Sequence, residues 1–419
     1  MSLAPGARVL VYSSLFPSPV APGAGLFIRE RMFRVAARLP LAVVAPQAWS
    51  PFDALIRLAR PGFRAPAPRY ERIDGIEVHR PRFLSVPGLF KRFDGWLMAR
   101  GSEACVRRVV AALGATVIDA HFGYPDGAAA VRLGRRLGLP VVVSLRGSKD
   151  RSLLGGSREA GLRAALVGAA QLIAVSRSLI RDVGEPLGQP ASRFELVGNG
   201  VDTARFAPVD RAQARARLGI PTDAPVIIGV GNRIPLKGFQ RVIPIVARLR
   251  RRHPGLVYLI VGGGSDQGDL GPELQRQAAA LGVADAVRLC GRQAPEDLCW
   301  HYGAADVFAL ATEYEGWANV LLEAMACGLP VVCTDVGGNA EVVTDASLGT
   351  LVPWWDEAAF ESALAGALVT RWNRERIRAH ALASGWDARV EQLVALFARV
   401  SAAGAAATPG RGPYSEEST

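Results

Sequence analysis

Residues 306–336 read DVFALATEYEGWANVLLEAMACGLPVVCTDV, and this stretch decides the fold. The apolar run Asp306–Ala311 predicts a buried strand, and the spacing of apolar positions over Asn319–Cys327 predicts a helix. Gly-Leu-Pro then ends that helix, and a second strand begins at Val331. A strand–helix–strand crossover of this kind joins parallel strands. The sequence therefore predicts an α/β protein with parallel sheets.

Two carboxylates in this stretch lie where parallel sheets bind their ligands. Such ligands sit beyond the carboxyl ends of the strands. Glu315 lies in the loop after the first strand, and Glu323 follows eight residues later, about one turn into the helix. Carboxylates can hold hydroxyl groups while the helix N-terminus holds an anion, and a nucleotide sugar offers both. The alternative is a solvated loop glutamate beside a surface-helix glutamate.

The string EGWANVLLEAMACGLPVV (315–332) resembles the Glu-x7-Glu signature of family 4 glycosyltransferases, which have the GT-B fold. This resemblance implies two doubly wound Rossmann-like domains facing a deep cleft, with a C-terminal helix crossing back to the N-terminal domain. It also implies a retaining sugar transfer from a nucleotide sugar. In that reaction Glu323 would bind the ribose hydroxyls, and Glu315 would bind the sugar hydroxyls and orient the ring.

The helix start departs from the family pattern. Trp317 and Ala318 stand where many relatives have Phe and Gly. Alanine adopts a positive φ only at a cost, so we expect an ordinary backbone conformation around Ala318. The resemblance places Ala318, Asn319 and Val320 against the donor.

Strand-like and helix-like segments alternate through both halves of the chain. Besides the crossover, we expect strands at 7–13, 41–46, 76–80, 117–122, 141–145, 172–176, 226–231, 257–263 and 286–291. The alternation predicts two doubly wound domains. We assign 1–200 to an acceptor-binding domain and 201–384 to a nucleotide-sugar-binding domain. Residues 385–400 form a helix that the resemblance packs on the first domain, and 401–419 are expected to be disordered.

Two cations lie in GVGNRIPLKGF (229–239), which follows a strand and leads into a helix. Arg233 offers a bidentate fork and Lys237 a point charge, so both can converge on a pyrophosphate. The resemblance assigns both to the donor diphosphate, where they stabilise the leaving charge. The alternative is two solvated loop cations. No Asp-x-Asp occurs, so we expect no metal and no cofactor beyond the nucleoside-diphosphate sugar as co-substrate.

Glycines mark further strand ends. Gly262, Gly264 and Gly291 follow the next two strands, and the resemblance places them along the nucleotide. Gly25 lies in the loop 16–27 after the first strand, which resembles the family's glycine loop near the donor phosphates. Glycine allows close approach of the backbone to a ligand, but plain turns are the alternative.

The first half contributes three polar candidates. His121 ends a strand in AHFGYPDG, and the resemblance places it against the donor sugar near the reacting centre. Arg146 and Asp150, in the next such loop, are expected on the acceptor side. A structural histidine and an ordinary surface loop are the alternatives.

The net charge of +11 allows nucleic acid, an anionic membrane surface or small anions as partners. No zinc-finger spacing or RNP-type aromatic string occurs, so we expect no nucleic-acid partner. Residues 87–100, PGLFKRFDGWLMAR, predict a basic amphipathic surface helix that suits an anionic membrane. A solvated helix packed on its own domain is the alternative. No apolar run long enough to span a bilayer and no signal-type N-terminus occur, so we expect a cytoplasmic protein, with peripheral attachment to the inner face of the cytoplasmic membrane left open.

These features predict a metal-independent hexosyltransferase, and the resemblance alone implies that it retains the anomeric configuration. It would act on a glycan or lipid-linked acceptor in cell-envelope, exopolysaccharide or lipid-linked glycan synthesis. Two alternatives remain open. One is a nucleotide-sugar 2-epimerase of the same fold, which needs no acceptor, and the other is a non-catalytic nucleotide-sugar-binding subunit.

Overall fold

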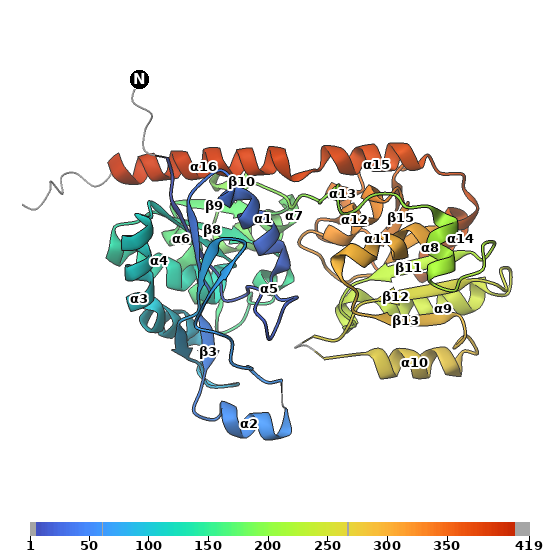
Figure 1. Cartoon of the computed structure of the whole chain (residues 1–419), viewed down its shortest axis with the longest axis horizontal. Helices are drawn as coiled ribbons and strands as arrows, with labels where there is room; N and C mark the ends of the chain where they lie inside the picture. The colour runs from blue at the N-terminus through green and yellow to red at the C-terminus, as the bar shows by residue number, and fades with distance from the viewer. Residues whose placement is uncertain (1–5, 61, 266–267, 407–419) are drawn as a thin grey trace, which may run out of the picture. The chain divides into compact units, whose positions relative to one another are not determined.

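The computed structural model describes residues 6–60, 62–265 and 268–406, and the chain forms two compact units (Figure 1). Unit 1 comprises the residues up to Gly198 and those from Asp387 on, and unit 2 comprises Asn199–Trp386. The expected tail residues 407–419 lie outside the described residues.

An eight-stranded sheet forms the centre of unit 1, with strand order β10-β9-β8-β7-β1-β2-β5-β4. Its strands are β1 (Val9–Tyr12), β2 (Leu41–Val44), β4 (Tyr70–Ile73), β5 (Ile76–His79), β7 (Val117–His121), β8 (Val141–Leu145), β9 (Gln171–Ala174) and β10 (Phe194–Leu196). All neighbours are parallel except β4 and β5. The buried apolar runs of β1, β7 and β8 fit a sheet that is covered on both faces.

A second, two-stranded sheet in unit 1 pairs β3 (Gln47–Trp49) with β6 (Arg82–Leu84). The sequence did not predict β3, β4, β6 or β10. Each is three or four residues long and mixes polar with apolar residues, so none shows the apolar run or alternation that marks a strand.

Helices and single helical turns connect the strands of unit 1. The helices are α1 (Leu26–Ala36), α2 (Asp53–Ala59), α3 (Asp94–Leu113), α4 (Ala128–Leu137), α5 (Ser148–Arg151), α6 (Glu159–Gly168), α7 (Arg177–Leu179) and α16 (Trp386–Ala406). The turns are η1 (Lys91–Phe93), η2 (Gly123–Gly127), η3 (Ile180–Gly184), η4 (Glu185–Leu187) and η5 (Ala191–Arg193). Among the helices in the described parts of the chain, none has the length and apolar character needed to cross a bilayer.

The helix α16 packs on unit 1 through Val390, Leu393, Phe397 and Val400, which are buried at helical spacing. It continues to Ala406, so residues 401–406, which were expected to be disordered, are helical. This segment is rich in alanine, the strongest helix former. The hydroxyl of its first residue, Ser401, lies 2.9 Å from Thr116 Oγ1.

The helix expected over 87–100 starts later and runs further than predicted. Gly88 and Phe90 have φ values of 74° and 55°, in the left-handed region, so regular helix cannot include them. The helical turn η1 begins at Lys91, and α3 then runs from Asp94 to Leu113.

Unit 2 contains a six-stranded parallel sheet with order β13-β12-β11-β14-β15-β16. Its strands are β11 (Val226–Val230), β12 (Val257–Val261), β13 (Val287–Gly291), β14 (Val307–Leu310), β15 (Val331–Thr334) and β16 (Gly349–Val352). Of these, only β16 was not predicted. The order reverses between β11 and β14, and doubly wound sheets bind their ligands beyond the carboxyl ends of the strands at such a reversal.

Helices cover both faces of this sheet, and two buried apolar clusters mark the two interfaces. One cluster involves α9 (Phe239–Leu249), α10 (Gly271–Ala280) and α14 (Glu357–Val369). The other involves α8 (Arg211–Arg217), α11 (Pro295–Ala304), α12 (Asn319–Ala326) and α15 (Arg374–Ala383), while η6 (Pro235–Lys237) and α13 (Asn339–Val342) complete the unit.

Candidate functional site

Lys237 and Glu315 form an ion pair in unit 2. Lys237 follows β11 and Glu315 follows β14, so the pair lies at the reversal of strand order. The two side chains are only 19% and 13% exposed. Two further hydrogen bonds join the same loops, since Leu236 O accepts from Glu313 N and from Thr312 Oγ1, each at 2.9 Å. The structure thus brings together a cation and a carboxylate that lie 78 residues apart.

Arg233 does not join that pair but binds Asp269. Its Nε and Nη2 atoms donate to the two carboxylate oxygens at 2.9 and 2.8 Å. Asp269 Oδ1 also accepts from Gly271 N, the first residue of α10, at 2.8 Å. The Arg233 hydrogen bonds, followed by that of Gly271, lower the pKa of Asp269. The sequence analysis missed Asp269, although it lies just beyond the glycine run that was singled out.

The three predicted glycines of unit 2 let neighbouring loops approach one another. Gly262 has a φ of 142°, and a Cβ there would lie 1.8 Å from Gly231 O, so only glycine fits. Its N–H donates to Gly291 O at 2.8 Å, and a Cβ on Gly264 would meet the side chain of Asp269. The loops after β11, β12 and β13 therefore contact one another, and the N–H of Arg233 donates to Gly263 O at 2.8 Å.

The helix α12 begins at Asn319 directly after the Glu315 loop. Ala318 has φ −84° and ψ 90°, the ordinary conformation expected for alanine. The N-cap residue Ala318 has no side chain that could cap the helix N-terminus, and Asn319 Oδ1 accepts from Asn199 Nδ2 at 2.9 Å. Val320 is partly buried against the core. The first N–H groups of α12 therefore lack a capping side chain beside the loop that carries Glu315.

Glu323 lies in the fifth position of α12 and is partly buried. Its Oε2 accepts a hydrogen bond from the hydroxyl of Tyr302, at 3.0 Å. Tyr302 belongs to α11 and is fully buried. Tyr302 could not be predicted as a partner of Glu323, because tyrosine at a helical core position is typical of plain packing.

His121 is fully buried at the end of β7, where its Nε2 lies 3.1 Å from Asp119 Oδ2. Burial lowers the pKa of His121 to about 4, although the nearby Asp119 charge opposes that shift. The imidazole is therefore neutral near pH 7. The absence of exposed surface on His121 favours the structural interpretation, while its contact with the donor sugar stays a prediction. Asp119 was not predicted, although it lies two residues away on the same face of the strand.

Asp150 is fully buried and faces inward rather than lining an acceptor surface. Its two oxygens accept from Gly123 N and Arg146 N, both at 2.8 Å, so it joins the loops after β7 and β8. Burial raises its pKa, an effect that these backbone hydrogen bonds oppose. Arg146 is also buried, and its guanidinium lies 5.2 Å from the centre of the Phe27 ring. Burial lowers the pKa of Arg146 to about 10. In this structure Asp150 thus joins two loops, and the place of Arg146 and Asp150 on the acceptor side stays a prediction.

The loop after β1 is held in a similar way. Asp126 is buried and accepts hydrogen bonds from the backbone N–H and the hydroxyl of Ser14. Gly25 precedes α1 with a φ of 66°, and a Cβ there would lie 2.3 Å from Leu15 O. Sequence reasoning quoted the segment that contains Asp126 but did not single out this carboxylate. Asp126 and Asp150 together brace three loops at the carboxyl edge of the unit 1 sheet.

Comparison with known proteins finds a glycosyltransferase family match in each of the two units. Residues 210–382 match the family described as glycosyl transferases group 1, and residues 55–205 match Glycosyltransferase Family 4. A D-inositol 3-phosphate glycosyltransferase from Acidothermus cellulolyticus is 34% identical over 67% of this chain and 66% of its own length. The corresponding protein from Segniliparus rotundus is 31% identical over 82% of this chain and 80% of its own.

Two solved structures share the fold. Sucrose-phosphate synthase from Thermosynechococcus elongatus has a TM-score of 0.74 at 21% identity, covering 95% of this chain and all of that one. HepE from Anabaena, solved in complex with UDP, has a TM-score of 0.69 at 19% identity, covering 94% of this chain and all of its own. At these identities the likeness concerns the fold, which is GT-B.

Proposed function

The chain belongs to family 4 of the glycosyltransferases, enzymes that transfer sugars, and from this premise we propose what it transfers and how. The donor is a nucleoside-diphosphate sugar, and a hexose-type sugar moves to an acceptor hydroxyl with retention of its anomeric configuration. The observation that carries this proposal is the partly buried ion pair of Lys237 and Glu315 at the strand reversal of unit 2. A cation and a carboxylate in contact suit a ligand with an anionic and a hydroxyl-bearing part on adjacent atoms.

In the proposed complex, Lys237 and Arg233 bind the diphosphate and stabilise the negative charge that develops on the leaving group. The uncapped N-terminus of α12 adds N–H donors and the positive end of the helix dipole. Preorganised cations of this kind can supply the stabilisation that a metal ion gives elsewhere. We therefore propose a reaction without a metal cofactor, in which no side chain of this chain acts as the nucleophile.

In this proposal the carboxylates bind the hydroxyl groups of the donor, and the glycine loops lie along its nucleotide. Glu315 binds sugar hydroxyls and exchanges part of its contact with Lys237 for them. Glu323, oriented by Tyr302, binds the ribose hydroxyls. Gly262, Gly264 and Gly291 leave room for the nucleotide to pass close to the backbone. His121, Arg146 and Asp150 position the loops of unit 1, where the acceptor binds.

The acceptor is proposed from chemistry and from the relatives. Two relatives are named for transfer to D-inositol 3-phosphate, so a phosphorylated acceptor is one candidate. The basic charge of this chain also fits a lipid-linked glycan in cell-envelope or exopolysaccharide synthesis, met at the inner face of the cytoplasmic membrane.

Ligand-induced stabilisation tests the donor assignment. The purified chain is heated with UDP, GDP, ADP and their sugars, because a ligand that binds the folded state adds about 2.7 kcal/mol at a hundred times its Kd. We expect one nucleotide series to raise the melting temperature and the same series to support release of the nucleoside diphosphate with an acceptor. The anomeric configuration of the product is then read by NMR.

Four outcomes contradict the proposal. If no nucleotide sugar stabilised the protein, the proposed donor site would be wrong. A product with inverted anomeric configuration would contradict the proposed retention. A changed sugar in the donor when no acceptor is present would identify an epimerase. Binding without any turnover toward phosphorylated or lipid-linked acceptors would identify a non-catalytic subunit.

A further inference from the structure

Large apolar side chains are exposed in one part of unit 1. Of the sixteen such side chains exposed in the described residues, ten lie between Trp49 and Trp96. They come from α2 and the residue before it, from the ends of β3 and β6, from the start of β4, and from the segment 86–97 that leads into α3. Exposed apolar residues scattered singly are ordinary, but a concentration of this kind marks a surface that another body covers.

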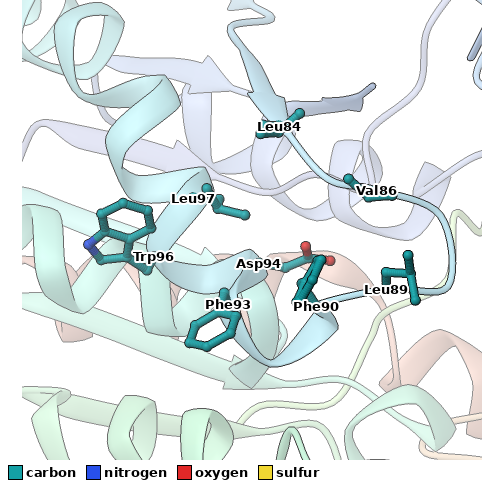
Figure 2. Close-up of a pocket in the computed structure, with 8 residues that line it drawn as sticks. All are labelled: Leu84, Val86, Leu89, Phe90, Phe93, Asp94, Trp96 and Leu97. Atoms are coloured by element: carbon teal, nitrogen blue, oxygen red, sulfur yellow. The ribbon is translucent and has the colours of Figure 1, made fainter. Parts of the chain in front are cut away.

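Five of these side chains line a hollow of about 230 Å³, which Figure 2 shows between the end of β6 and the start of α3. It is lined by Leu84, Val86, Leu89, Phe90, Phe93, Asp94, Trp96 and Leu97. Phe90 and Leu89 are 65% and 58% exposed. The single carboxylate of the lining, Asp94, pairs with Lys91 at 3.3 Å. The hollow therefore offers an apolar surface, open to solvent.

A polar network beneath the hollow holds these apolar side chains outward. Ser85 is buried, and its Oγ accepts from Lys91 Nζ at 2.7 Å while its carbonyl accepts from Arg64 Nη1 at 2.6 Å. Its N–H donates to Trp49 O at 2.9 Å, which joins the segment to β3. The surface is thus built into the fold rather than carried by a free loop.

Cations lie directly beside the apolar hollow. A second hollow of about 140 Å³ shares Phe93 and Trp96 with the first and is lined by Arg92, Arg132 and Arg135. All three arginines are exposed, and within the described residues none of them forms an ion pair or a hydrogen bond. The guanidinium of Arg92 lies 4.8 Å from the centre of the Phe93 ring. Guanidinium groups without carboxylate partners suit phosphate oxygens, which they bind in bidentate fashion.

We propose that this surface docks unit 1 onto a bilayer that carries anionic lipids. Leu89, Phe90, Phe93 and Trp96 enter the boundary of the acyl chains, and the three arginines of the second hollow bind lipid phosphates. Charge favours this occupant over a second copy of the chain. A two-fold contact between identical surfaces brings the unpaired arginines of both copies together, and like charges repel.

The docking surface connects directly to the turn after β7, at the carboxyl edge of the unit 1 sheet. The hydroxyl of Tyr124 donates to Lys91 O at 2.7 Å and accepts from Gly95 N at 3.2 Å. Tyr124 belongs to the turn after β7, three residues beyond His121. Docking thus fixes the loops of unit 1 near a membrane, where a lipid-linked acceptor is presented. That last step rests on the proposed function, whereas docking itself does not.

Vesicle sedimentation of the full chain tests the docking surface. We expect binding to vesicles of phosphatidylcholine with phosphatidylglycerol, weaker binding to phosphatidylcholine alone, and release by salt. The double variant Leu89→Ser/Phe90→Ser should lower the partition coefficient by about tenfold or more, because two exposed apolar side chains no longer enter the lipid. Arg132→Glu/Arg135→Glu should lower it by about tenfold at low salt and less at high salt.

Matched variants in unit 2 serve as controls. Val369→Ser/Leu382→Ser removes two exposed apolar side chains, and Arg251→Glu/Arg252→Glu reverses two exposed arginines. Both should bind vesicles like the wild type, and circular dichroism should show all four variants folded. Absence of binding to anionic vesicles, or equal losses in the control variants, would overturn the proposal. Self-association that the Leu89→Ser/Phe90→Ser variant abolishes, seen by sedimentation velocity without vesicles, would assign the surface to a second copy instead. Vesicle binding is measured without turnover, so membrane docking and sugar transfer can fail independently.

Discussion

Lys237 pairs with Glu315 where the strand order of the unit 2 sheet reverses, so each side chain holds the other in a partly buried position. In the ligand-free protein the Glu315 carboxylate binds the Lys237 ammonium group, which would bind the diphosphate in the proposed complex. Donor binding therefore replaces one set of contacts of Lys237 with another, and it does not bury an unpaired charge.

Removal of either partner should cost both activity and stability. Glu315→Gln or Lys237→Met should lower kcat/KM for the donor by about a hundredfold, since a charge-assisted contact to the reacting ligand is lost. Each single variant also leaves a partly buried charge unpaired, which we expect to lower the free energy of unfolding by about 1–3 kcal/mol. Urea unfolding and donor kinetics measure the two effects.

The double variant Glu315→Gln/Lys237→Met separates these effects. It leaves no unpaired charge, so the free energy of unfolding should recover most of the loss seen in the single variants. Activity should stay low. A double variant that regains turnover together with stability would show that the pair supports the fold only.

Arg233 and Arg250 provide a matched comparison within unit 2. Each forms a bidentate pair with an aspartate, Arg233 with Asp269 and Arg250 with Asp285 at 2.7 and 2.8 Å. Arg250 follows α9 and Asp285 precedes β13, so their pair lies at the amino ends of the strands, away from the candidate site. Arg233→Ala should therefore lower kcat/KM for the donor by about 10- to 100-fold, while Arg250→Ala should leave it unchanged.

Stability provides the control for this comparison. Both pairs involve an exposed aspartate, so each alanine variant should lower the free energy of unfolding by about 1 kcal/mol or less. Equal effects of the two substitutions on donor kinetics would mean that Arg233 does not bind the diphosphate.

Two buried tyrosines test the orientation of Glu323. The hydroxyl of Tyr302 donates to Glu323, whereas the buried hydroxyl of Tyr258 has no hydrogen-bond partner in the described parts of the chain. Tyr302→Phe should weaken nucleotide binding about tenfold, because a hydrogen bond to a charged group is worth roughly 1.5–3 kcal/mol. Tyr258→Phe should bind the nucleotide like the wild type and be as stable or more stable. Calorimetric titration measures both, and equal affinities of the two variants would remove Tyr302 from this role.

The sequence predicted the sheets well because their signal is local. Apolar runs ending in glycine, proline or polar residues identified most strands, and the carboxyl end of each strand then located the loops that carry Lys237 and Glu315. The short strands β3, β6 and β10 were not predicted, because pairing with their neighbours, rather than their own composition, makes them strands. Helix ends were predicted wrongly where the backbone conformation of a single residue determines them, as the positive φ of Phe90 does before α3.

The direction in which a polar side chain points was harder to predict than its loop. Asp150 and His121 occupy the expected strand ends, yet both face inward, because neighbouring loops supply backbone donors or a second buried charge. The pair of Arg233 and Asp269 joins positions 36 residues apart that meet only because the loops after β11 and β12 lie side by side. Sequence spacing carries no information on such contacts.

The buried His121 should make the stability of unit 1 depend on pH. Its pKa is about 4 in the folded protein, below the ordinary value of about 6.5, so between these values the unfolded chain binds a proton that the folded chain does not. The free energy of unfolding should therefore fall as the pH drops through this range, by about 2 kcal/mol at pH 5. The raised pKa values of buried Asp126 and Asp150 act in the opposite direction, so the wild type alone does not isolate the effect.

Comparison with His121→Gln isolates it, because Asp126 and Asp150 contribute to both proteins. The difference in free energy of unfolding between the wild type and this variant, from urea denaturation at pH 7.5 and pH 5, should shift by about 2 kcal/mol against the wild type at the lower pH. Because the folded imidazole stays neutral above pH 5, the two proteins should have pH–rate profiles of the same shape. Equal losses of stability in both proteins at pH 5 would show that His121 is protonated in the folded protein. A limb of the pH–rate profile that is present in the wild type and absent in the variant would show that His121 takes part in the reaction.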